Sequence, residues 1–73
     1  VHKFFFHQLK QDHPKLSPRD LYLCAYIKMN LSSKEIASLL NITSRGIEIS
    51  RYRLRKKLNL KRDDNLSVYL SNL

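Results

Sequence analysis

Residues 32–58 read SSKEIASLLNITSRGIEISRYRLRKKL, and this stretch decides the expected fold. It opens with the capping-box spacing S-x-x-E, which predicts a short apolar helix. Asn41 then suits a turn with positive φ, and Thr43 or Ser44 caps a second helix over about residues 44–58. Two helices joined by a tight turn form a helix-turn-helix, a device that places its second helix in the major groove of DNA.

The second helix separates into an apolar and a basic face on a helical wheel. Ile47, Leu54 and Leu58 point in one direction and are expected to meet the core. The other side carries the candidate base contacts, which are Arg45, Glu48, Ile49, Tyr52 and Arg53.

Two of these candidates have competing interpretations. Ile49 can meet a thymine methyl group, although a single exposed aliphatic residue is ordinary on any surface. Glu48 can accept from a cytosine amino group or pair within the helix with Arg45 or Tyr52, and we favour the intrahelical pair.

Phosphate contacts are expected from cations and helix N-termini around the motif. The candidates are Ser32, Ser33, Lys34, Thr43, Ser44, Arg51, Arg55, Lys56 and Lys57, followed by Lys61 and Arg62. Positions 45–62 hold eight Lys or Arg and one acid, a net +7 within a chain of net +8. Charge concentrated in this way is typical of a surface for a polyanion, although many charge runs are only solvated helix faces.

The remaining sequence also predicts helices, because it has one Gly, two Pro and no alternation typical of strands. We expect an all-α fold, a small helix-turn-helix bundle of four core helices in residues 16–73. An additional N-terminal aromatic helix lies in residues 1–15 and buries Phe5, Phe6 and Leu9 against the bundle. A membrane or partner contact for the Phe run is the less favoured interpretation.

Over Leu16–Leu58 the chain resembles the LuxR/GerE-type helix-turn-helix family. The matching positions are Leu16, Ser17, Arg19, Asp20, Ser32, Lys34, Glu35, Ile36, Ala37, Leu40, Ile42, Thr43, Ile47, Leu54, Lys57 and Leu58. Four positions depart from the usual pattern: Asn30 stands for Gly, Gly46 for Thr, Glu48 for Lys and Ser50 for His.

The resemblance implies a four-helix DNA-binding domain, usually the C-terminal output of a larger bacterial regulator and usually dimeric. It places the base-facing residues at Glu48, Ile49 and Tyr52. It also implies an upstream sensory or receiver domain, and RNA polymerase is a further candidate partner. The start at Val1 rather than Met likewise suggests a piece of a longer protein.

The last predicted helix begins after Asn65 and carries the apolar stripe Leu66, Tyr69, Leu70 and Leu73. We expect this stripe mainly to cover the core, which a chain of this size needs. In the family the same helix commonly pairs two copies, so a smaller contribution to a homodimer is expected as well.

Residues that carry catalysis or hold cofactors are not recognisable in the sequence. His2, His7 and His13 lack metal-ligand spacing, and Cys24 is expected to be a small core residue. A single Gly cannot form a phosphate-binding loop. We therefore expect no enzyme, no cofactor and no metal, and a cytoplasmic location for this domain, whether or not the intact protein is membrane-anchored.

The sequence thus predicts sequence-specific binding of double-stranded DNA as the output of a transcription regulator. One rival is a promoter-reading domain of a sigma factor, which would bind RNA polymerase core and prefer a promoter element. The other is a basic helical protein-interaction module. Any polyanion would compete equally well for its basic face, with no dependence on base sequence.

Overall fold

The computed structural model describes residues 2–61 and 63–73, and all regular structure in this part of the chain is helical. The helices are α1 (His2–Asp12), α2 (Pro18–Lys28), α3 (Ser33–Leu40), α4 (Ser44–Lys57) and α5 (Leu66–Ser71). This confirms the all-α prediction. No helix in the described residues is both long and apolar enough to cross a membrane.

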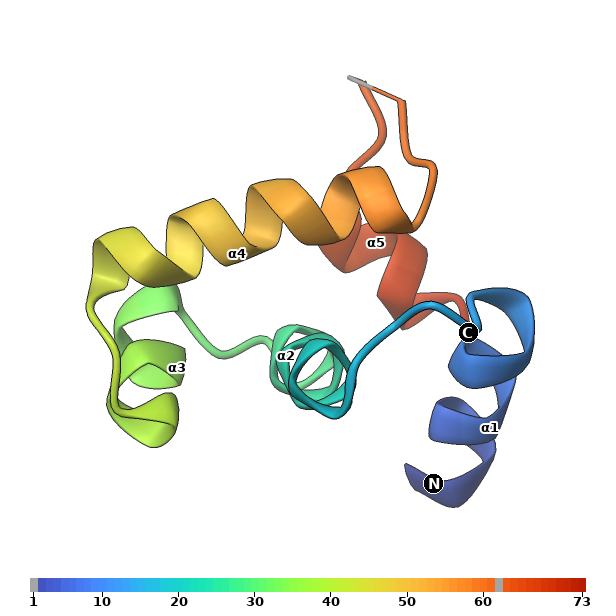
Figure 1. The fold of residues 1–73 in the computed structure, drawn as a ribbon, viewed down its shortest axis with the longest axis horizontal. Helices are drawn as coiled ribbons and strands as arrows, with labels where there is room; N and C mark the ends of the chain where they lie inside the picture. The colour runs from blue at the N-terminus through green and yellow to red at the C-terminus, as the bar shows by residue number, and fades with distance from the viewer. Residues whose placement is uncertain (1, 62) are drawn as a thin grey trace.

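The longest helix, α4, lies along one side of the molecule, and the other helices lie beneath it (Figure 1). α3 packs chiefly against α4, whereas α5 and α1 both pack against α2. α3 and α4 therefore form the predicted helix-turn-helix, and α2 joins it to the two ends of the chain.

Side-chain caps fix where four of the helices begin. The hydroxyl groups of Ser17 and Ser32 accept from the backbone N–H three residues later, and the carboxylates at Asp20 and Glu35 complete both capping boxes. Thr43 caps α4, and the last helix begins at its predicted cap, Asn65. Of the two caps considered for α4, the structure uses Thr43.

The ends of α2, α3 and α4 share one device, an Asn in the left-handed conformation. Asn30, Asn41 and Asn59 have φ values of 63°, 57° and 59°. After α2, for example, the Asn30 N–H donates to the Ile27 carbonyl and the Leu31 N–H to the Tyr26 carbonyl. Asn tolerates this conformation better than other residues with a Cβ, so Asn30 can replace the family's Gly.

One continuous core joins all five helices. Its buried members are Phe5, Leu9, Leu16, Leu23, Cys24, Ile27, Ile36, Ala37, Ile47, Leu54, Leu58, Leu66 and Leu70. Burial raises the pKa of the Cys24 thiol to about 12, and the charge of Asp20 adds to this effect. The thiol therefore stays protonated at neutral pH, as expected of a core residue.

We predict that the chain loses stability in acid because of its two capping boxes. Burial raises the pKa of Asp20, but hydrogen bonds from Lys57 and Ser17 bring it below its ordinary value of 3.8. A backbone hydrogen bond from Ser32 lowers the pKa of Glu35 below 4.5. Both carboxyl groups bind protons more weakly when folded, so their stabilisation is present above these ordinary values and is lost as the pH falls through the lower folded values.

Urea unfolding between pH 3 and pH 6 measures this effect. The double variant Asp20→Asn, Glu35→Gln keeps acceptor oxygens at both caps but removes the titration. It should show a shallower decline below pH 5 than the unmodified chain. Identical pH profiles for the two proteins would assign the acid sensitivity to other groups.

Candidate nucleic-acid interface

α4 divides into a buried and an exposed face, as its sequence predicts. Ile47 and Leu54 are completely buried and Leu58 is 3% exposed, whereas Ile49 is 46% and Tyr52 60% exposed. The apolar side of α4 therefore faces the core. The polar side faces solvent, and both Ile49 and Tyr52 lie on it.

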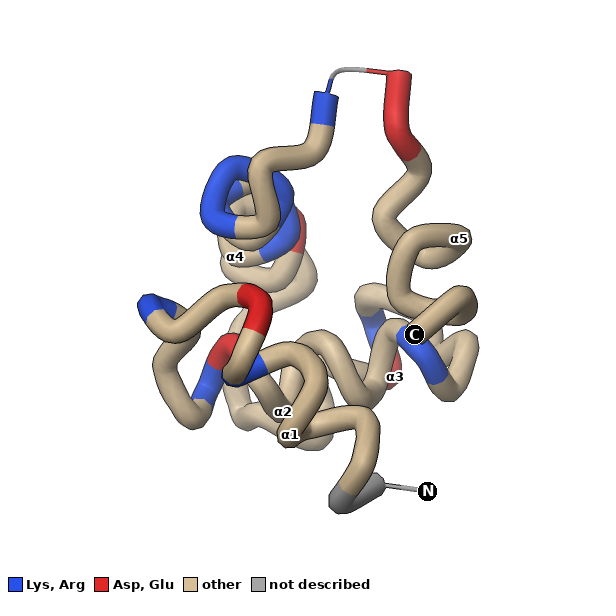
Figure 2. The backbone as a smooth tube through the Cα atoms, turned by 90° about the vertical axis from the view of Figure 1, so that its right-hand side faces the viewer, with Lys and Arg blue, Asp and Glu red and all other residues tan. Residues whose placement is uncertain are grey.

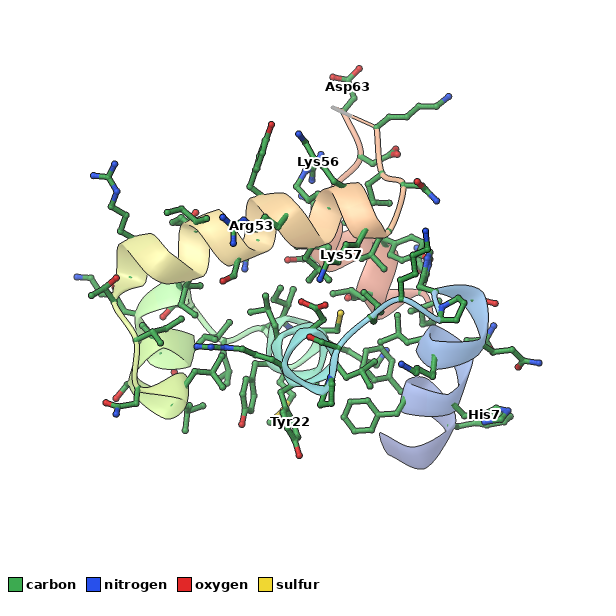
Figure 3. All side chains as sticks on the ribbon, in the orientation of Figure 1. His7, Tyr22, Arg53, Lys56, Lys57 and Asp63 are labelled. Atoms are coloured by element: carbon green, nitrogen blue, oxygen red, sulfur yellow. The ribbon has the colours of Figure 1, made fainter. Side chains whose placement is uncertain are left out.

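The candidate base contacts all lie on this outer face. Arg45, Glu48 and Arg53 are exposed together with Ile49 and Tyr52. The ammonium group of Lys56 lies 4.7 Å from the centre of the Tyr52 ring, a cation–π contact on the helix surface. Figure 3 shows Lys56 directed to the outer side of α4. The helix thus presents an aliphatic, an aromatic and several cationic side chains to one side.

Glu48 has a partner that the sequence did not predict. Its carboxylate accepts a hydrogen bond from the hydroxyl of Ser33, the first residue of α3. The sequence favours a pair with Arg45 or Tyr52 within α4, whereas the contact in the structure crosses between the two helices of the motif. Ser33 is half-buried, and its hydroxyl is directed to Glu48 rather than to solvent.

Besides Ser33, two cations that were predicted to contact phosphates are engaged within the molecule. The Lys57 ammonium lies 2.6 Å from a carboxylate oxygen of Asp20, and Figure 3 shows it directed toward α2, away from the outer face. The Arg55 guanidinium donates to the carbonyl oxygens of Lys61 and Asp64, at 2.8 and 2.6 Å. Both side chains hold parts of the fold together.

The other predicted phosphate contacts vary in exposure. The exposed ones are Ser32, Lys34, Thr43, Ser44, Lys56 and Lys61, and Arg51 is half-buried. The hydroxyl groups of Ser32 and Thr43 already accept from backbone N–H groups as caps. Arg62 lies outside the described residues. In Figure 2 the basic residues gather most densely on α4 and on the first limb of the segment after it.

The apolar stripe of α5 belongs to the core. Leu66 and Leu70 are buried, and Tyr69 and Leu73 are partly buried against the same cluster. This confirms that the stripe packs in the core. Val68, which is 57% exposed, is the large apolar residue that α5 presents to solvent, and pairing of two copies through α5 stays a prediction.

Two polar contacts at α5 were not foreseen from the sequence. The Lys28 ammonium donates to the carbonyl oxygens of Leu70, Ser71 and Leu73 at the C-terminal end of this helix. His13 and Tyr69 share a hydrogen bond of 2.8 Å between a ring nitrogen and the phenolic oxygen. A Lys in the last turn of a helix usually binds the free carbonyl groups of that same helix. Lys28, in the last turn of α2, instead binds those of α5, 42 or more residues away in sequence.

The described residues hold no group of three or more His, Cys, Asp or Glu side chains that could bind a metal ion. The fold and the basic outer face of α4 instead define a helix-turn-helix domain of the DNA-binding class. The profile of the family described as bacterial regulatory proteins, luxR family (GerE) matches residues 14–70, and the chain belongs to this family. Neither the curated proteins nor the solved structures gave a match.

Proposed function

We propose that this chain binds double-stranded DNA sequence-specifically, with α4 in the major groove, as the output domain of a larger transcription regulator. Membership of the luxR family supports DNA binding by a regulatory domain. The observation that carries the finer proposal is the exposure of Ile49 and Tyr52 on a basic helix face. An aliphatic and an aromatic residue there gain nothing from the core, but both can contact base edges.

The proposed readout assigns different chemistry to different residues. Ile49 contacts a thymine methyl group, while Tyr52 and Arg53 contact base edges or adjacent phosphates. Because Ser33 holds its carboxylate, Glu48 can accept from a cytosine amino group only in the orientation that this bond allows. Glu48 thereby also disfavours a base that presents an acceptor at that position.

In this proposal the contacts to the DNA backbone come mainly from the exposed cations and from the N-terminus of α3. Lys34 and Lys56 are exposed and able to approach phosphates. Lys57 contributes less, because a phosphate has to compete with Asp20 for its ammonium group.

We predict that Ile49→Ala or Tyr52→Ala relaxes base preference by about 1–3 kcal/mol at one position of the binding site. The measurement is selection from a random duplex pool by each variant, followed by affinities for single-base changes in the selected site. Phe4→Ala is the control, because Phe4 is also exposed but lies on α1, outside the helix-turn-helix. It should leave the selected site unchanged.

Unchanged base preference in both α4 variants would remove the proposed readout face. If any polyanion displaced the chain from a duplex equally well, the result would favour the protein-interaction module. Stable binding to RNA polymerase core with preference for a promoter element would favour the sigma-factor alternative. An upstream sensory or receiver domain and a homodimer on a two-part site are parts of the same proposal.

A further inference from the structure

The segment after α4, of which residues 59–61 and 63–65 are described, stands beside the outer face of this helix. It follows directly after this helix and rises past its C-terminal end in both views of the backbone (Figures 1 and 2). Figure 3 shows Asp63 at the far end of the segment, on the side of α4 to which Lys56 is directed. A duplex that lies along the outer face of α4 therefore also meets this segment.

Hydrogen bonds join the two described stretches of this segment to each other and to α4. The Lys61 N–H donates to a carboxylate oxygen of Asp64 at 2.8 Å, and the Asp64 N–H donates to the Lys61 carbonyl at 3.0 Å. Arg55 fastens both stretches to α4 through the carbonyl oxygens of the same two residues. The left-handed Asn59 sets the direction in which the chain leaves the helix.

A groove of about 590 Å³ lies between α4 and this segment. Its lining is Tyr52, Arg55, Lys56 and Leu60. The Lys56 ammonium and the Tyr52 phenol suit a phosphate, and the aliphatic Leu60 suits the apolar face of a deoxyribose. The chemistry of the groove therefore matches one sugar-phosphate strand.

We propose that the described stretches of this segment, residues 59–61 and 63–65, form a second DNA-contacting element, and that the groove beside them holds the strand that borders the major groove entered by α4. Arg55 is the positioning residue that holds the segment there. This inference rests on the proposed DNA binding. A helix with its side chains is about 10–12 Å across and fills a major groove about 12 Å wide. A second element on the same side of the protein then has to lie over the backbone.

Asp63 supplies the sharpest test, because a carboxylate at the end of the segment opposes a nearby phosphate. Asp63→Asn should raise affinity about two- to threefold in 0.05 M salt, the effect of one charge within a Debye length. The probe is a duplex selected from a random pool by the 73-residue chain, and the readout is its dissociation constant at several salt concentrations.

His7→Lys is the matched control, because it changes the net charge by the same +1. His7 lies on α1, remote from α4 (Figure 3). Its effect on affinity should be smaller than that of Asp63→Asn. Equal effects of the two variants, or none from Asp63→Asn, would overturn the second contact. A chain that binds no duplex at all would instead overturn the proposed function.

The role of Arg55 is tested by repeating Asp63→Asn in an Arg55→Gln background. Without the two hydrogen bonds from Arg55 to its carbonyl groups, the segment should no longer stay beside the DNA strand. The gain in affinity from Asp63→Asn should then fall toward onefold, that is, disappear. A residue that only supplied charge or general stability would leave that ratio unchanged. The same gain in both backgrounds would therefore refute the positioning role.

Discussion

We expect Ile47→Ala to lower the free energy of unfolding by about 2–5 kcal/mol. Ile47 is completely buried in the core that joins α4 to the rest of the chain. A chain of this size has a total stability of only about 3–5 kcal/mol. Most of the molecules should then be unfolded at 37 °C, and DNA binding should be lost with the fold. Urea and thermal unfolding followed by circular dichroism measure the change.

Ile49→Ala is the matched control, with the same substitution two residues further along the same helix. Ile49 is 46% exposed, so its replacement should change the free energy of unfolding by no more than about 0.5 kcal/mol. The two variants thus separate stability from recognition, since the first should lose the fold and the second base preference. Similar losses of stability would mean that α4 does not present Ile49 to solvent.

The division of α4 was predictable because it depends only on the order of residues within one helix. A rotation of 100° per residue puts Ile47 and Leu54 on one side and Ile49 and Tyr52 on the other. The first residues of the helices were equally predictable, because Ser17 and Ser32 cap backbone groups only three residues away. Local geometry of this kind needs no knowledge of the tertiary fold.

Partners of the long charged side chains were not predictable by the same means. Lys57 and Asp20 are separated by 37 residues, and nothing in either local sequence indicates that they meet. Likewise, Glu48 bonds to Ser33 on the neighbouring helix. Lys and Arg have long flexible stems, so which acceptor they reach depends on how the helices pack. The cationic character of α4 could be predicted, but not which of its charges the fold itself uses.

α1 poses the remaining question, whether residues 1–15 form an accessory helix separate from a DNA-binding domain of residues 16–73. The family match begins at residue 14, so α1 lies outside it. Phe5 nevertheless belongs to the common core, and the Lys28 ammonium lies 5.1 Å from the centre of its ring. The same ammonium group binds the carbonyl oxygens at the end of α5. We therefore propose that α1 and the remaining helices unfold together.

Phe5→Ala tests this proposal and should lower the free energy of unfolding by about 3–5 kcal/mol in a single transition. The neighbouring Phe4→Ala is the control, because Phe4 is 81% exposed and Phe5 only 4%. Its effect should stay within about 0.5 kcal/mol. If α1 were an independent appendage, Phe5→Ala would melt that helix alone and leave the main transition in place. In that case circular dichroism would show a small early loss of helix, and DNA binding would persist.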